Sequence, residues 1–187
     1  VDKVEVREKR RRPRPPFITS SLQQEASRRL RFSPRRTMRV AQQLYEGVSL
    51  GRRGSTGLIT YMRSDSVKVA GVAQAEARGY IAERFGPEFV PPYIPRYKSR
   101  AKRAQEAHEA IRPTSVRREP QAIKKFLTGD QYRLYDLIWK RFLASQMAPA
   151  LLDVTTVEVK AGDPQKEMPY LFRASGSLLK FPGFLVI

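Results

Sequence analysis

The sequence predicts an α+β fold in which a mainly helical body, residues 20–150, lies between two strand-like flanks. Apolar residues recur at helical spacing through the middle of the chain. By contrast, the start of the chain alternates apolar and charged residues, and residues 151–187 are rich in β-branched and aromatic side chains. We therefore expect a helical domain inserted in a β-rich domain, whose two parts are residues 1–19 and 151–187.

The first flank reads as a short strand followed by a stiff basic linker. Val1, Val4 and Val6 alternate with charged residues, and the stretch REKRRRPRPP follows. Its three prolines lack a backbone N–H and have a fixed φ, so they continue neither a ladder nor a helix.

Two short helices are expected at the start of the body. The stretch SSLQQ, which begins at Ser20, contains a capping box in two registers. Ser33 and Pro34 then provide an N-cap and a proline at the first helical position, and Gly47 marks the end of the second helix. Four residues of that helix are expected to face inward: Met38, Ala41, Leu44 and Tyr45.

A glycine-rich loop, GVSLGRRGSTG, separates these helices from a short extended piece at residues 58–62. Asp65 or Ser66 is the expected cap of the next helix, with Val72 on its inner face and Gly86 at its end.

The last helix opens with a capping box formed by Thr128 and Gln131. Its wide apolar stripe predicts a core helix, and Trp139 lies next to that stripe. The stripe consists of Leu134, Leu137, Ile138, Phe142 and Leu143.

Charge points to a polyanionic partner. The chain has 36 basic and 18 acidic residues, a net charge of +18. Residues 28–53 alone hold eight arginines and one glutamate, and residues 96–103 hold five basic residues and no acid. Nucleic acid is the first candidate, with binding that weakens steeply as salt rises, and a solubilising surface is the alternative. The absence of cysteine and the single histidine exclude disulfides and thiolate or histidine-rich metal sites within this chain.

The stretch LITYMRSDS places Arg63 two residues after Tyr61. A tyrosine hydroxyl has a reference pKa of ~10, so it is a poor nucleophile at neutral pH unless a neighbour favours the phenolate. A guanidinium does this, and it also neutralises charge that builds on a pentacoordinate phosphorus. In an extended segment the two side chains share a face. This spacing permits a nucleophile, but Y-x-R is a common pattern, and by itself it favours a core aromatic before a helix cap.

Four segments, read together, favour the nucleophile. GLITYMRSDS closely resembles the active-site segment of type IA DNA topoisomerases, and QEAHEAIRPT resembles the second signature of that family. PPFITSSLQQEASRRLRFSPRRTMRVAQQLYEG and LYDLIWKRFLASQMAPA resemble the family's stretches before the tyrosine and after the histidine. A methionine after the tyrosine resembles the bacterial topoisomerase I branch; topoisomerase III tends to have proline there, and reverse gyrase carries an additional helicase.

The resemblance implies that Tyr61 attacks a backbone phosphate of single-stranded DNA and forms a 5′-phosphotyrosine. The other strand then passes through the gap before resealing, which relaxes negative supercoils without ATP. Arg63 would stabilise the transition state, and His108 would contact a phosphate near the scissile one. The residues expected to contact DNA are Ser64, Asp65, Arg112, Arg52 and Arg53, of which Asp65 and Arg112 are expected mainly to hold the site together.

The resemblance also implies parts that this sequence lacks. The family's Mg²⁺-binding domain carries a glutamate and a D-x-D-x-E cluster, and no D-x-D occurs here. We therefore expect no cofactor within this chain and a fragment, part of the type IA toroid, that is inactive alone. Its expected partners are single-stranded or negatively supercoiled DNA and the missing metal-binding and toroid domains, in the bacterial cytoplasm at the nucleoid and not at a membrane.

Two other functions fit parts of the sequence. A non-catalytic basic nucleic-acid-binding module would explain the charge, and it would bind without regard to Tyr61 and without preference for unpaired strands. A tyrosine recombinase shares phosphotyrosine chemistry, but it needs several dispersed arginines and histidines, and this chain has one histidine.

Overall fold

The computed structural model describes residues 1–187 except 52–53, 98–107 and 164–169. It divides into a sheet unit, Val1–Arg12 with Ala148–Val186, and a helical unit, Pro13–Met147. The mixed helix and strand content confirms the predicted α+β class. Among the described residues, no helix is both long and apolar enough to cross a membrane.

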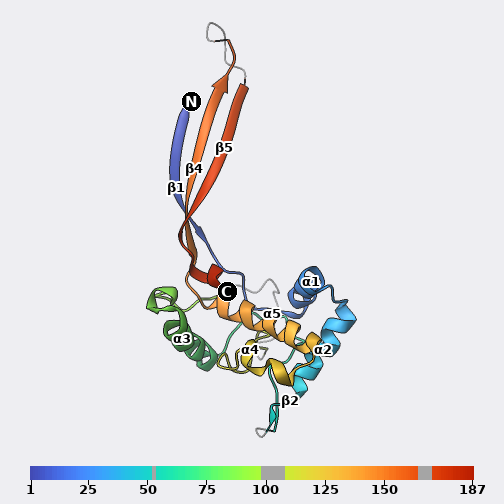
Figure 1. The fold of residues 1–187 in the computed structure, drawn as a ribbon. Helices are drawn as coiled ribbons and strands as arrows, with labels where there is room; N and C mark the ends of the chain where they lie inside the picture. Colours follow the sequence, from blue (N-terminus) through green and yellow to red (C-terminus); the bar gives the residue numbers. More distant parts are fainter. Residues whose placement is uncertain (52–53, 98–107, 164–169) are drawn as a thin grey trace. The chain divides into compact units, whose positions relative to one another are not determined.

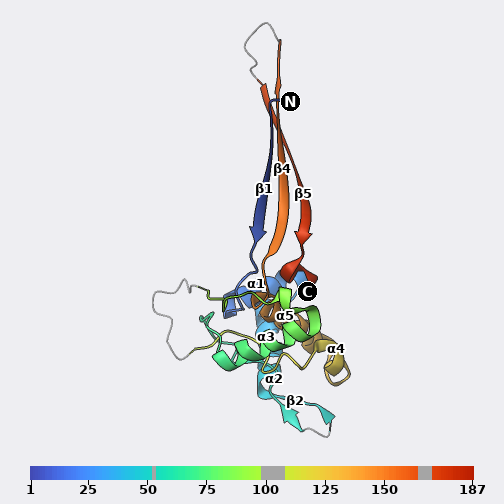
Figure 2. The same ribbon diagram turned by 90° about the vertical axis from the view of Figure 1, so that its left-hand side faces the viewer.

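The sheet unit joins the two ends of the chain. Its strands are β1 (Lys3–Arg11), β4 (Ala150–Ala161) and β5 (Tyr170–Phe181), in the order β1-β4-β5 with antiparallel neighbours (Figure 2). β1 is longer than the predicted short strand, because its arginines and lysines remain in the ladder up to the pairing of Arg11 with Ala150. A short 3₁₀ helix, η4 (Gly183–Val186), follows β5.

In the described part of the helical unit, the body is formed by five helices, and Figure 1 shows α5 among them. They are α1 (Thr19–Leu30), α2 (Pro34–Glu46), α3 (Gly71–Phe85), α4 (Pro120–Ile123) and α5 (Gly129–Ser145). Two 3₁₀ turns, η2 (Pro87–Phe89) and η3 (Lys124–Phe126), follow α3 and α4. The predicted glycine-rich loop contains two short paired strands, β2 (Val48–Ser49) and β3 (Ser55–Thr56).

The core of this unit forms around α5. The predicted stripe of α5 is buried, and the helix packs against α1, α2 and α4. Trp139 is buried too, and its indole N–H donates to the carbonyl of Val116 at 2.9 Å, which satisfies the one polar group of the ring. The ring of Tyr80 on α3 meets Trp139 edge to face at 5.9 Å. The core therefore connects α3 and α5 through aromatic contacts.

Most helix ends follow their capping signals. Ser33 accepts from the backbone N–H of Arg36, and the box of Thr128 and Gln131 is complete. Gly47 and Gly86 occupy the C-cap positions of α2 and α3 at positive φ.

Other local predictions were wrong. α1 begins at Thr19, before either predicted box, and Ser21 closes its first turn by accepting from the N–H of Ile18 at 3.0 Å. α3 begins at Gly71, well after Asp65 and Ser66, and Val72 on it is 84 % exposed.

A buried glutamate holds the basic linker to the helical unit. Glu25 on α1 is 6 % exposed, and it pairs with Arg29 at 2.7 Å and with Arg14 and Arg141 at 3.5 Å each. The Arg141 guanidinium also lies 4.3 Å from the ring centre of Phe17, a cation–π contact. Because burial lowers the pKa of Arg141, the Glu25 carboxylate is needed to keep this charge compatible with its surroundings.

Candidate active site

Two distant stretches of chain meet to form the base of the site. Ile59 and Pro113 form an antiparallel bridge, and the N–H of Thr60 donates to the carbonyl of Arg112 at 2.9 Å. The Thr60 hydroxyl donates to the carbonyl of Ala110 at 2.7 Å and accepts from the N–H of Arg112 at 3.0 Å. These bonds fix Thr60, the residue before Tyr61, to the HEAIRPT stretch that contains His108.

The first residue of α1 supports the other side of the site. The hydroxyl of Thr19 donates to the carbonyl of Met62 at 2.8 Å, with a longer contact to that of Ser64 at 3.1 Å, and it accepts from the N–H of Ser64 at 2.9 Å. The backbone N–H of Thr19 donates to the Ser64 carbonyl at 2.8 Å. One side chain therefore holds the backbone on both sides of Arg63. Nothing in the local sequence marks Thr19 for this role.

Tyr61 does not belong to the core. Its neighbours Leu58, Ile59 and Met62 are buried, whereas Tyr61 is 46 % exposed. Its ring meets Tyr45 of α2 edge to face at 5.4 Å. Tyr45 was predicted to face inward, but it is 41 % exposed, because it lies at the edge of the apolar face of α2. The hydroxyl-bearing ring of Tyr61 is thus presented at the surface by a fixed backbone.

Three other tyrosines are less suited to act as nucleophiles, because burial raises the pKa of each hydroxyl. Tyr80 donates to the carboxylate of Glu119, and burial, helped by that carboxylate, raises its pKa to about 12. Burial raises the pKa of Tyr97 and of Tyr135 as well, and both hydroxyls donate to backbone carbonyls. Raised pKa values disfavour the phenolate that attack on phosphorus requires.

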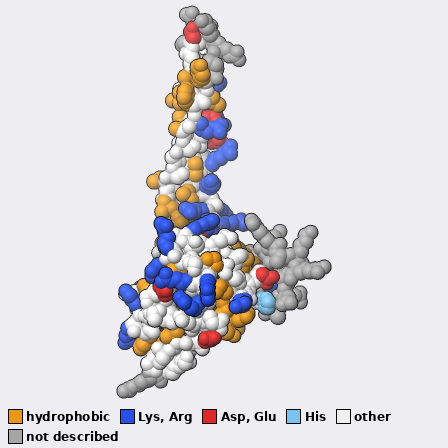
Figure 3. Space-filling view, turned by 90° about the vertical axis from the view of Figure 1, so that its right-hand side faces the viewer, with side chains coloured by type: hydrophobic (Ala, Val, Ile, Leu, Met, Phe, Trp, Pro, Cys, Tyr) orange, Lys and Arg blue, Asp and Glu red, His pale blue; other side chains and the backbone are white. Residues whose placement is uncertain are grey.

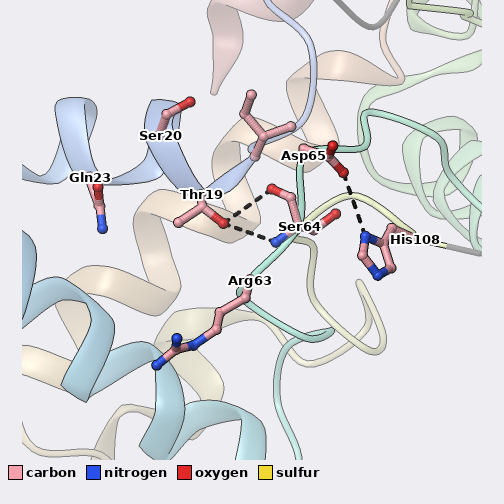
Figure 4. Close-up of a pocket in the computed structure, with 8 residues that line it drawn as sticks. Thr19, Ser20, Gln23, Arg63, Ser64, Asp65 and His108 are labelled. Carbon is pink, nitrogen blue, oxygen red and sulfur yellow. Dashed lines mark hydrogen bonds and ion pairs between the residues drawn. The ribbon is translucent and has the colours of Figure 1, made fainter. Parts of the chain in front are cut away.

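A cavity of about 560 Å³ lies beside the tyrosine segment. Its described lining residues are Ile18, Thr19, Ser20, Gln23, Arg63, Ser64, Asp65 and His108 (Figure 4). Nδ1 of His108 lies 3.5 Å from a carboxylate oxygen of Asp65, and both side chains are more than one third exposed. The cavity therefore brings together Arg63 and His108, two residues that the sequence singled out, with polar groups of α1.

The tyrosine segment is not extended through the site. Residues 62 and 63 form a bend, so the rule that residues i and i+2 share a face does not hold between Tyr61 and Arg63. Arg63 lines the cavity, and its side chain extends away from His108 in Figure 4. No acidic side chain among the described residues pairs with Arg63, so its charge is available to an anion.

The side chain of Arg112 is used within the chain. Its Nε and Nη2 donate to the two carboxylate oxygens of Glu109 at 2.7 and 3.0 Å, and Nη1 donates to the carbonyl of Pro113 at 2.8 Å. Glu109 also accepts from the N–H of Ala70 at 2.8 Å. Sequence reasoning missed Glu109, although the E-x-x-R spacing in HEAIRPT was its signal. This forked pair holds the segment next to His108.

Of the remaining predicted site residues, Ser64 is buried in the structure, whereas Arg52 and Arg53 are not described by it. Ser64 is 6 % exposed, and its hydroxyl donates to the Glu109 carbonyl at 2.6 Å and accepts from the N–H of Ser66 at 3.1 Å. Arg52 and Arg53 lie outside the described residues, as does most of the basic stretch 96–103. Their contacts with DNA stay predictions.

Comparison with known proteins identifies the class. The family model for DNA topoisomerase matches residues 1–187. DNA topoisomerase 1 from two strains of Xylella fastidiosa, Temecula1 and 9a5c, is 49% identical over all 187 residues of this chain. Full-length topoisomerase I from Thermotoga maritima has a similar structure, with a TM-score of 0.83 and 43% identity over 97% of this chain.

These matches define a class of isomerases, the DNA topoisomerases. The chain belongs to the type IA DNA topoisomerase family, in its bacterial topoisomerase I branch. It spans 22% of the length of the Xylella relatives and 28% of the Thermotoga chain.

Proposed function

We propose that this segment supplies the nucleophile of an enzyme that cuts and rejoins one DNA strand. The Tyr61 oxygen attacks a backbone phosphorus, a P–O bond to Tyr61 forms, and the P–O3′ bond breaks. Tyr61 gives up its proton, and the departing 3′ oxygen takes one. The products are a 5′-phosphotyrosine and a free 3′ hydroxyl, and reversal reseals the strand. Because one phosphodiester replaces another, the bond energy is kept and no ATP is required.

The observation that supports this proposal best is the exposure of Tyr61 on a braced backbone, two residues before Arg63, which lines the cavity together with His108. Arg63, without an acidic partner among the described residues, neutralises the charge that develops on the phosphate oxygens. His108 binds a phosphate next to the scissile one, and Asp65 orients its ring from the Nδ1 side. Ser64 and Arg112 act by holding this arrangement, whereas Arg52 and Arg53 contact the strand.

We propose that the Mg²⁺ used by the whole enzyme is held outside these residues. In the described part of the chain, no three His, Cys, Asp or Glu side chains come close enough to share a metal ion. The residues present therefore do not fit a site of their own, and we assign no step of this segment to the metal. The substrate of the whole enzyme is negatively supercoiled DNA, and the segment alone is inactive.

The decisive experiment measures the covalent adduct. In a full-length enzyme that carries this segment, Tyr61→Phe abolishes the protein–DNA adduct on a labelled single-stranded oligonucleotide with Mg²⁺. Tyr93→Phe is the matched control, because Tyr93 is also exposed, at 53 %, and should leave the adduct unchanged. An adduct retained in Tyr61→Phe would remove Tyr61 from its role. Robust plasmid relaxation by residues 1–187 alone would contradict the inactivity of the segment.

A further inference from the structure

A second hollow continues along α1 from the cavity of the candidate site. It measures about 380 Å³ and shares two lining residues, Ser20 and Gln23, with the first cavity. Gln24, Ser27, Arg28 and Pro34 complete its described lining. The two hollows therefore adjoin, and we call them together the α1 groove.

The floor of the α1 groove suits a sugar–phosphate backbone. Ser20, Gln23 and Ser27 follow the spacing of one helix face, and their short side chains carry hydroxyl and amide donors. Such uncharged donors commonly bind phosphate oxygens. From Ser20 to Arg28 the helix rises about 12 Å, at ~1.5 Å per residue. That length matches roughly three stacked nucleotides at ~3.4 Å each.

Residues 28–39, of which Arg28 and Pro34 line the outer end of the α1 groove, carry unneutralised charge. Of the six arginines in residues 28–39, Arg29 is paired with Glu25 and Arg36 with Asp130. The other four have no acidic partner among the described residues: Arg28, Arg31, Arg35 and Arg39. All four are exposed, and Figure 3 shows basic side chains gathered on this face of the helical unit. Residues 28–39 contain no acid, so this surface attracts a polyanion.

We propose that the α1 groove and these four arginines bind the backbone of single-stranded DNA to one side of the phosphate that Tyr61 attacks. The proposal rests on the proposed function, because the inner end of the groove is the cavity lined by Arg63 and His108. A single strand is the expected occupant, since the inner end of the groove lies in the same cavity as Arg63, where the proposed function places the strand to be cut. The occupant is thus the substrate strand, held by contacts that carry no sequence information.

The test is a titration of residues 1–187 with a fluorescent single-stranded oligonucleotide, followed by anisotropy at several salt concentrations. Each phosphate contact to a single strand contributes about 0.7 to the salt slope, which amounts to about fivefold in affinity at 0.1 M salt. The double variant Arg28→Gln/Arg35→Gln should bind about 25-fold more weakly at 0.1 M salt and lose about 1.4 from the slope.

The matched control is Arg78→Gln/Arg84→Gln, which removes the same charge from α3. It should change both quantities far less. An equal loss of affinity in the two double variants would show that only net charge matters and would overturn the proposal. Wild-type affinity in Arg28→Gln/Arg35→Gln would overturn it as well. Equal competition by duplex DNA would overturn the single-strand assignment.

A second variant keeps every charge. Ser20→Ala/Gln23→Ala should weaken binding at unchanged salt slope, and unchanged affinity would remove these residues from the site. All titrations can use a Tyr61→Phe background, so binding is measured without cleavage. The adduct assay of the proposed function then fails or succeeds independently of the α1 groove.

Discussion

Thr19→Val removes the hydroxyl that braces the backbone on both sides of Arg63 while keeping the shape of the side chain. The change leaves the carbonyl of Met62 and the N–H of Ser64 without the partners that they have at 2.8 and 2.9 Å. At about 1 kcal/mol for each hydrogen bond, the loss is about 2 kcal/mol. A protein of this size should then melt about 4–8 °C lower. If the whole loss is expressed in the transition state, strand cleavage slows about 30-fold.

The assay is single-turnover adduct formation by a full-length enzyme that carries this segment, with saturating single-stranded DNA. A brace that positions Arg63 lowers the rate constant at saturation and leaves the half-saturating DNA concentration nearly unchanged. Thr19→Ser keeps the hydroxyl and should restore both rate and stability. A wild-type cleavage rate in Thr19→Val, with only the melting temperature lowered, would refute the positioning role. An equally slow Thr19→Ser would refute the hydrogen-bonding argument.

Three further predictions concern stability. Glu25→Gln leaves the partly buried Arg141 guanidinium without its carboxylate and should cost about 3 kcal/mol, measured by urea unfolding. An unchanged unfolding midpoint would contradict the role of this cluster. The pKa of Tyr80 is higher in the folded state, so its contribution to stability is complete below pH 10.0 and is lost as the pH rises through about 12. In melting curves measured across this pH range, Tyr80→Phe should therefore lose less stability at alkaline pH than the wild type. Arg112→Lys keeps the charge but not the forked pair with Glu109, so it should lower the melting temperature and leave the affinity for single-stranded DNA unchanged in anisotropy. A weakened affinity would contradict a purely structural role for Arg112.

Local sequence signals, each within about one helical turn, predicted most of the helix boundaries of the helical unit. The Ser33 and Thr128 caps and the Gly47 and Gly86 ends follow from local hydrogen bonding and backbone freedom, and they are confirmed. The late start of α3 was not predictable in this way, because Ser66 uses its hydroxyl on the N–H of Lys68 in an irregular stretch before the helix. Side-chain bonds that support loops look like caps in the sequence.

In the candidate site, too, some residues could be predicted from the sequence and others could not. Tyr61, Arg63 and His108 were named from the sequence, but their catalytic roles remain predictions. Thr19 was not found, because its partners lie more than 40 positions away and no local pattern records them. The edge position of Tyr45 also escaped prediction, since helical periodicity gives a face but not the boundary of that face.

The bridge between Ile59 and Pro113 also bears on how the site folds. Closing the 54 positions between them (113 − 59) costs about 3.5 kcal/mol of chain entropy beyond a constant. Neither stretch recovers that cost alone, so the two should form and open as one cooperative unit. The amides of Thr60, Arg112 and Thr114 should therefore exchange with solvent deuterium at a common rate, although they belong to separate parts of the sequence. The nucleophile would then become ordered only when the histidine stretch has docked.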